Sequence, residues 1–108
     1  MSKLVLWVDD LRNPPNRPDE QYVIVRSVNE AKYYIELGEF DFAYIDLDHD
    51  AGIYAPDGGD YINILNYIEE KVYHGYKVNY AFHIHSFNPV GVVNMRAIIK
   101  RNGWKELL

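Results

Sequence analysis

Three short polar clusters, far apart in the sequence, carry the residue types that could do chemistry. They are Asp9-Asp10, Asp48-His49-Asp50 and the segment 83–88, which reads His-Ile-His-Ser-Phe-Asn. Paired carboxylates with oxygen-rich neighbours suit Mg²⁺, which takes few protein ligands and keeps several waters. Histidine titrates near neutral pH and can therefore give or take a proton in catalysis. The chain has no cysteine, which excludes disulfides, thiolate nucleophiles and cysteine-ligated metals.

Each cluster follows an apolar run that is typical of a buried strand. Strands are predicted at residues 4–8, 22–26, 40–47 and 80–86. Helices are predicted to follow the capping box Ser27/Glu30, to run through the apolar positions 61, 65, 68 and 72, and to extend from Asn88-Pro89 to Asn102-Gly103. This alternation predicts a parallel sheet with helices on both faces. Ligands bind beyond the carboxyl ends of such strands, so we expect the three clusters to meet at one rim.

Composition and charge narrow the classes of protein to which the chain can belong. With 108 residues, of which 48% are hydrophobic and 25% charged, it is expected to form a single domain over residues 1–108. Residues 1–60 carry 13 acidic and 5 basic side chains, a net charge of −8, whereas residues 61–108 carry 3 acidic and 6 basic ones, a net charge of +3. The acidic half argues against duplex DNA as a partner. No membrane span or secretory signal is evident, so a cytoplasmic location is expected and the oligomeric state is left open.

The carboxylates have two metal-binding interpretations and one without metal. Asp9, Asp10 and Asp48 are predicted to hold a divalent cation, with Mg²⁺ favoured and Mn²⁺ or Zn²⁺ as alternatives. A zinc site from His83, His85 and Asp48 is a second interpretation, since zinc accepts nitrogen and carboxylate ligands. Otherwise the aspartates only cap loops, as turn residues commonly do.

The histidines alternate with apolar residues along the fourth predicted strand. His83 and His85 therefore share one face of the sheet, and His85 lies at the rim. That position favours His85 as a general acid or base, although a strand histidine is often only a hydrogen-bonded core residue. Ser86 points to the opposite face from His85, which argues against a serine–histidine nucleophile pair. Asp46 lies deeper than Asp48 on one strand face and is interpreted as structural.

The order of these elements and three short boxes resemble a known family. The boxes are Trp7-Val8-Asp9-Asp10-Leu11-Arg12, Leu47-Asp48-His49-Asp50 and His83-Ile84-His85-Ser86-Phe87-Asn88-Pro89. In this order they are similar to the cyclic-phosphate-processing receiver domains, which are related to the receiver domains of response regulators. The resemblance covers nearly the whole chain and implies a small receiver-like (flavodoxin-like) α/β fold. This is a three-layer sandwich around a truncated parallel sheet of order 2-1-3-4, because residues 104–108 are too few for a full fifth strand and helix.

The resemblance also implies a function and a set of roles. The implied function is a phosphoesterase that acts on a cyclic or diester phosphate, with a cyclic nucleotide or a cyclic-phosphate RNA end as substrate. His85, Asp48 and His83 would be catalytic, and Asp9, Asp10 and Asp48 would hold the divalent cation. The phosphate would be bound by Arg12, Ser86, Asn88 and His49.

Two alternative functions stay open. One is a non-catalytic receiver-like module that binds a nucleotide or a protein partner at the same rim. The other is a receiver that accepts a phosphoryl group on Asp48. The second is disfavoured because no lysine stands where the fifth strand of a signalling receiver would deliver one.

Overall fold

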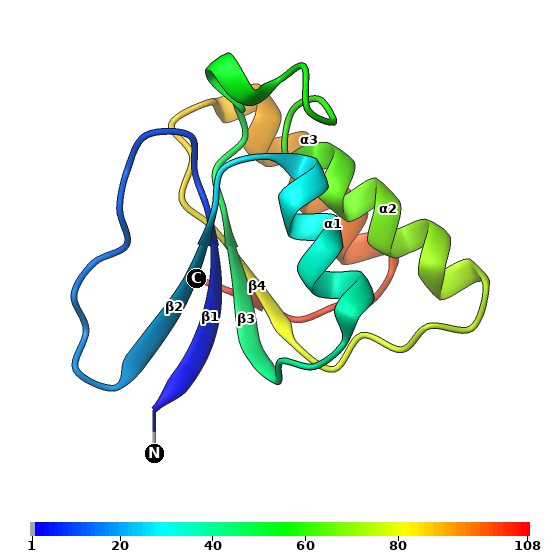
Figure 1. Ribbon diagram of the computed structural model, residues 1–108. Coiled ribbons are helices and arrows are strands. Elements are labelled where there is room, and N and C mark those ends of the chain that lie inside the picture. The colour runs from blue at the N-terminus through cyan, green and yellow to red at the C-terminus, as the bar shows by residue number, and fades with distance from the viewer. Residues whose placement is uncertain (1) are drawn as a thin grey trace.

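Parallel pairing of short apolar strands forms the sheet that positions the rim. The structure, a computed structural model, describes residues 2–108 (Figure 1). Its strands are β1 (Lys3–Val8), β2 (Glu20–Val25), β3 (Phe42–Leu47), β4 (Ala81–Ile84) and β5 (Glu106–Leu107). Each neighbouring pair is parallel, and the order is β2-β1-β3-β4-β5. The predicted order 2-1-3-4 is confirmed, and the two-residue β5 extends it beside β4.

The three α-helices found within residues 2–108 lie on one face of the sheet (Figure 1). They are α1 (Val28–Leu37), α2 (Ile62–Tyr73) and α3 (Pro89–Arg101), and a 3₁₀ turn η1 (Gly52–Tyr54) precedes α2. The connections β2–β3, β3–β4 and β4–β5 all step in the same direction across the sheet, so right-handed crossovers place their helices on the same side. Of the helices described, none is long and apolar enough to cross a membrane.

Within the described part of the chain, the opposite face of the sheet has no helix over it, which differs from the expected three layers. The connection β1–β2 steps in the other direction, where a right-handed crossover helix would cover this face. Residues 9–19 instead form a loop with Pro14, Pro15 and Pro18, and proline has no N–H for a helical hydrogen bond. The fold is receiver-like α/β as predicted, with two layers of secondary structure. The helix-free face is packed by a small cluster: Val5, Tyr44 and Ala81, with Tyr22 and Leu107 against them.

Local sequence signals start the helices next to the rim. Ser27 Oγ accepts a hydrogen bond from the N–H of Glu30 at 3.1 Å, and the Glu30 carboxylate accepts the N–H of Arg26 at 2.7 Å. Asn88 caps α3, because its Oδ1 accepts the N–H of Gly91 at 2.9 Å. Both predicted caps are confirmed, and they fix the loops that lead from β2 and β4 into α1 and α3.

Each of the four predicted strands differs from the observed one by one or two residues at one or both ends. β1 begins at Lys3 rather than at residue 4, β2 spans Glu20–Val25 rather than residues 22–26, and β4 begins at Ala81 rather than at residue 80. β3 begins at Phe42 rather than at residue 40, and β4 ends at Ile84 rather than at residue 86. The N–H of His85 still donates to the Leu47 carbonyl at 2.9 Å, so His85 keeps its place beside β3. The chain leaves the sheet at Ser86, because it must turn to begin α3 at Pro89.

An ion pair joins α2 to α3 far from the rim. Arg101 donates from Nε and Nη2 to the two carboxylate oxygens of Glu69, at 2.7 and 2.6 Å, and Asn102 donates to the same group at 2.6 Å. These hydrogen bonds lower the pKa of Glu69 to about 2. A carboxylate with a depressed folded-state pKa stabilises the fold above its unfolded-state pKa and loses that effect as the pH falls through the folded-state value.

Glu69→Gln is therefore expected to lower the free energy of unfolding by about 1 kcal/mol at neutral pH, since the pair is bidentate but partly exposed to solvent. As the pH falls from 4.5 to about 2, the wild-type carboxylate becomes protonated and the two proteins should become equally stable. Urea unfolding across this pH range is the measurement. Glu70→Gln, which removes only an exposed contact with His74, is the control. A difference that does not depend on pH would contradict this account.

Candidate functional site

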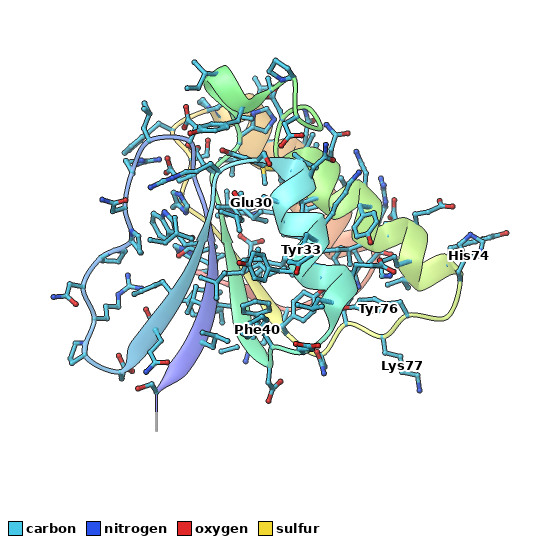
Figure 2. All side chains as sticks on the ribbon, in the orientation of Figure 1. Glu30, Tyr33, Phe40, His74, Tyr76 and Lys77 are labelled. Carbon is cyan, nitrogen blue, oxygen red and sulfur yellow. The ribbon has the colours of Figure 1, made fainter. Side chains whose placement is uncertain are left out.

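A hollow opens beyond the carboxyl ends of the strands, where the three polar clusters were expected to meet. We call it the rim hollow. The loops after β1, β3 and β4, which line it, lie at the upper end of the molecule in Figure 2, opposite the labelled Phe40 and Lys77. Its lining comes from the loops after β1, β3 and β4: Asp10, Arg12, Asp48, Asp50, Ser86, Phe87, Asn88 and Pro89. Each of the three clusters contributes side chains, whereas the predicted site residues Asp9, His49, His83 and His85 are not part of the lining.

Asp9 is completely buried and uses both carboxylate oxygens within the protein. Oδ1 accepts the N–H groups of Leu11 and Arg12 at 2.9 and 2.8 Å. Oδ2 lies 3.1 Å from Nε of Arg12 and 2.9 Å from Nε2 of His85. Burial raises the pKa of Asp9, but these hydrogen bonds and the charge of Arg12 outweigh it and lower the pKa. The predicted metal ligand Asp9 therefore holds the loop after β1 in place.

Arg12 is a cation fixed on the wall of the rim hollow. Its Nε is held by Asp9, and its Nη2 donates to the carbonyl of His85 at 3.1 Å. The same Nη2 lies 3.6 Å from Oδ2 of Asp48. The guanidinium carbon lies 5.1 Å from the centre of the Phe87 ring. Because 43% of the side chain is still exposed, Arg12 can meet an anion in the hollow without first being reoriented.

The sequence did not single out Arg26, which holds the loop after β1 in place by hydrogen bonds. Its Nη1 donates to the backbone carbonyls of Asp9 and Arg12 at 2.9 and 2.8 Å, and its Nη2 donates to Asn13 Oδ1 at 2.8 Å. The available signal was its position directly after β2, at the same edge of the sheet as the acidic clusters. Phe87 was also missed; it stands 89% exposed at the mouth of the hollow.

The carboxylates of Asp10, Asp48 and Asp50 line the rim hollow. Burial and the negative charges of Asp9 and Asp48 raise the pKa of Asp10. Gly52 makes room for it, because a Cβ there would lie 2.3 Å from Asp10 Oδ2, and its φ of +57° also favours glycine. Asp48 Oδ1 accepts the N–H of His49 at 2.8 Å.

The predicted metal triad Asp9, Asp10 and Asp48 is not assembled as one set of ligands. Within residues 2–108, Asp10 belongs to no group of three ligand atoms that lie within 4.8 Å of one another, whereas Asp9, Asp48 and His85 form such a group. The physical reason is that the Asp9 carboxylate is turned into its own loop and saturated by donors. Asp10 and Asp48 are left as the residues of the triad that can hold a cation in the hollow.

His49 is held beside the rim hollow by polar and steric contacts. Its Nδ1 lies 2.8 Å from Asp50 Oδ1 and 3.4 Å from Asn88 Nδ2. The ring packs against Gly91 at the start of α3, where a Cβ would lie 2.4 Å from the ring Cγ. Among the described residues no hydrogen-bond partner of Nε2 is found. His49 is thus an imidazole oriented by a carboxylate with one nitrogen still available.

Ser86 and Asn88 serve the turn into α3 as well as the hollow. Ser86 Oγ accepts the N–H of Asn88 at 3.1 Å, which leaves the hydroxyl proton free to be donated. The Asn88 Oδ1 is occupied by the helix cap, and its Nδ2 lies 3.4 Å from Asp50 Oδ1. Ser86 can therefore donate to a bound oxygen, while Asn88 acts chiefly by shaping the turn.

His83 and His85 have surroundings that differ from the expected ones. Both lie on the helix-free face, and the Nδ1 atoms of both face one oxygen of buried Asp46, at 2.8 and 2.6 Å. The second nitrogen of His85 faces Asp9, and its ring stacks on Trp7 at 4.1 Å. Asp46 is hydrogen-bonded, as its structural interpretation required. A direct catalytic role for His83 or His85 in the hollow is not supported by this placement and stays a prediction.

Comparison with known families places this site in context. A family model described as the cyclic-phosphate processing receiver domain matches residues 4–101. The chain belongs to this family. No curated protein and no solved structure was found to match the chain. The match confirms the resemblance seen in the three boxes, and it spans every residue that lines the rim hollow. The protein is therefore a receiver-like domain associated with cyclic-phosphate processing.

The close contact between Gly91 and His49 yields a test of the site geometry. Gly91→Ala should lower stability, because the new methyl group collides with the His49 ring even though alanine favours the helix by about 1 kcal/mol. In a His49→Ala background the collision is absent, so the same change should be neutral or stabilising. Chemical denaturation of the four proteins gives the coupling energy directly. Additive effects would show that His49 does not pack on Gly91.

Proposed function

We propose that this receiver-like domain is a phosphoesterase that cleaves a cyclic or diester phosphate of a nucleotide or an RNA end in the rim hollow. The family's link to cyclic phosphates supports the substrate class. The observation that carries the proposal is the fixed guanidinium of Arg12, held by Asp9 and His85 and exposed in a hollow whose other polar side chains are carboxylates, a serine and an asparagine. A preorganised cation beside carboxylates suits the stabilisation of phosphoryl oxygens.

Phosphate oxygens would be bound by Arg12 and Ser86. Arg12 offers N–H groups that match two phosphate oxygens, and its contact with Phe87 limits its movement. Ser86 offers a hydroxyl donor from the opposite loop. Ser86 lies just before α3, which begins at Pro89, and Arg12 contacts Phe87 in the same turn. The partial positive charge at the start of the helix also favours an anion there.

A divalent cation, Mg²⁺ by preference, would be held by Asp10 and Asp48. The donor set fits, because both are carboxylates in the hollow and the pKa of Asp10 is raised by burial and by neighbouring negative charge. When bound, such a cation would neutralise charge on the phosphoryl oxygens. Asp9 is not assigned to it, since donors of the protein surround both of its oxygens.

Proton transfer is assigned to His49 rather than to His85. His49 contacts two residues that line the hollow, Asp50 and Asn88, and is oriented by Asp50. Among the described residues its Nε2 has no hydrogen-bond partner, so this nitrogen is available. Both nitrogens of His85 already face carboxylates, so a proton on either is shared within the protein. His85 would act by positioning, since its carbonyl and its contact with Asp9 hold the guanidinium of Arg12.

The cation assignment predicts a metal-dependent stability. Thermal melts in millimolar Mg²⁺ or Mn²⁺ should shift upward, because a ligand that binds only the folded state stabilises it by mass action. Asp10→Asn should reduce this shift, and without metal it should be neutral or stabilising, since it removes charge repulsion from Asp9 and Asp48. Asp41→Asn, an exposed position away from the hollow, is the control. Equal shifts in wild type and Asp10→Asn would place the cation elsewhere.

The acid–base assignment predicts which histidine is needed for turnover. Assays on 2′,3′- and 3′,5′-cyclic nucleotides and on RNA ends with a 2′,3′-cyclic phosphate should show His49→Gln lowered by about 10²–10⁴-fold in kcat, with little change in KM. His74→Gln is the matched control, because His74 projects from the end of α2, far from the rim (Figure 2). Full activity of His49→Gln, together with loss in a folded His85→Gln, would return proton transfer to His85.

One observation favours a phospho-accepting receiver as the second candidate. Asp48 follows the central strand β3, and Arg12 places a cation 3.6 Å from it, although Lys105 lies at the amino end of β5, away from the rim. Incubation with a phosphoramidate donor would then yield a stable phosphoryl group on Asp48 and no turnover of any cyclic phosphate. Nucleotide binding without either reaction would instead indicate a non-catalytic binding module.

A further inference from the structure

A second cluster of ligand atoms lies on the helix-free face of the sheet, outside the rim hollow. Asp46 on β3 is in register with His83 on β4, and His85 follows two residues later. One oxygen of Asp46, Oδ1, lies 2.8 Å from Nδ1 of His83 and 2.6 Å from Nδ1 of His85. The three residues offer ligand atoms that all lie within 4.8 Å of one another. The phosphoesterase proposed above does not use this cluster as a ligand set.

The two contacts of the His85 ring need one more N–H donor than a neutral imidazole has. Nε2 of His85 lies 2.9 Å from Oδ2 of buried Asp9, so both nitrogens of this ring face carboxylate oxygens. A neutral imidazole has one N–H, and an ionised carboxylate has none. If Nε2 donates to Asp9, then Nδ1 turns a lone pair toward the lone pairs of Asp46. A second ring proton removes this conflict. A metal ion also removes it once the ligand atoms move apart from 2.6–2.8 Å to about 3.3 Å, the separation of two ligands in a tetrahedral zinc site.

We propose that Asp46, His83 and His85 bind a transition-metal ion, with zinc as the preferred metal. Zinc takes imidazole nitrogen and carboxylate oxygen in a tetrahedral set, and sites with three protein ligands leave one position open. Magnesium prefers oxygen ligands alone, so two imidazoles select against it. This site therefore differs in its metal from the cation proposed for Asp10 and Asp48.

The surroundings of His85 match those of a metal-bound imidazole. Ligating histidines almost always donate their second ring N–H to a carboxylate or a carbonyl, and Asp9 is placed to accept it. The ring is also stacked on Trp7, with 4.1 Å between the ring centres and 5° between the planes. Trp7 is fixed in turn, because its Nε1–H donates to the carbonyl of Arg12 at 2.9 Å. The His85 ring is thus locked with Nδ1 toward Asp46.

His83 gives the cluster its contact with solvent. Asp46 is buried and the His85 side chain is 12% exposed, whereas the His83 side chain is 32% exposed. A second hollow on the helix-free face reaches it, and this hollow is lined by Lys3, Arg17, Glu20, Tyr44, His83, Leu107 and Leu108. An ion held by the cluster would therefore have an entry path and an open side for a water ligand.

Metal binding is measured without turnover, so the outcome does not depend on the proposed phosphoesterase. The full chain, freed of metal with a chelator, is titrated with Zn²⁺ by calorimetry and with Co²⁺ by visible absorption. We expect one ion per chain and the intense visible bands of tetrahedral Co²⁺. The melting temperature should rise by on the order of 10 °C when free Zn²⁺ is about a hundredfold above Kd.

Trp7 provides a local reporter of where the ion sits. The chain has two tryptophans, and Trp104 stacks on Phe82 on the helical side of the sheet. In a Trp104→Phe variant the remaining fluorescence comes from Trp7, which is stacked on His85. Co²⁺ at the proposed site should quench this fluorescence in parallel with the absorption change.

Three variants decide whether the ion is held by this cluster. His83→Gln should weaken Zn²⁺ binding by at least about tenfold and remove the quenching, and its partial exposure makes it the ligand change least harmful to folding. His74→Gln and Asp10→Asn should both bind Zn²⁺ as the wild type does. Absence of saturable Zn²⁺ or Co²⁺ binding, or binding that His83→Gln leaves unchanged, overturns the proposal. The conflict at His85 would then be resolved by a second ring proton.

Discussion

The buried carboxylate of Asp9 is the interaction on which the rim depends. Burying a charged carboxylate costs several kcal/mol unless its oxygens are hydrogen-bonded, and here two backbone N–H groups, Arg12 and His85 surround it. The loop after β1 therefore cannot move away without leaving the charge unpaired. Arg12 is fixed by the same contacts, which is how a flexible side chain becomes a defined part of the hollow wall. His85 is fixed by its contact with Asp9 as well. Because His85 also faces Asp46, it links the rim to the helix-free face.

The missing helix between β1 and β2 has a second consequence for function. In a sheet covered on both faces, the side chains of Asp46, His83 and His85 would be enclosed by helices. Here that face carries a small apolar cluster of strand side chains, the loop after β1 contacts it through Arg12 and Arg17, and His83 remains partly exposed. The molecule thus has polar groups suited to ligands at two places, the rim hollow and the helix-free face. They meet at His85, whose ring nitrogens face Asp9 on one side and Asp46 on the other.

Family membership and local geometry point to the same end of the sheet, but they carry different weight. The family match extends over residues 4–101 and associates the chain with cyclic-phosphate processing. The assignment of roles rests on contacts instead: the guanidinium of Arg12 near Asp48, the raised pKa of Asp10 and the orientation of His49 by Asp50. The cation beside Asp48 is Arg12, which belongs to the loop after β1.

Local features of the sequence determined the approximate positions of the first four strands and the helix caps at Ser27 and Asn88. They also determined the order of these strands and the meeting of the loops after β1, β3 and β4 at one rim. They could do so because apolar periodicity and capping depend on near neighbours, and parallel strands bring their carboxyl ends to one edge. The tertiary structure alone decided which of the clustered side chains line the rim hollow. Asp9 and His85 were expected in the hollow but are used internally, while Arg26 and Phe87 were not anticipated. A buried polar group must find its partners across the sheet, as His85 does with Asp9 and Asp46, and sequence spacing carries no information about those partners.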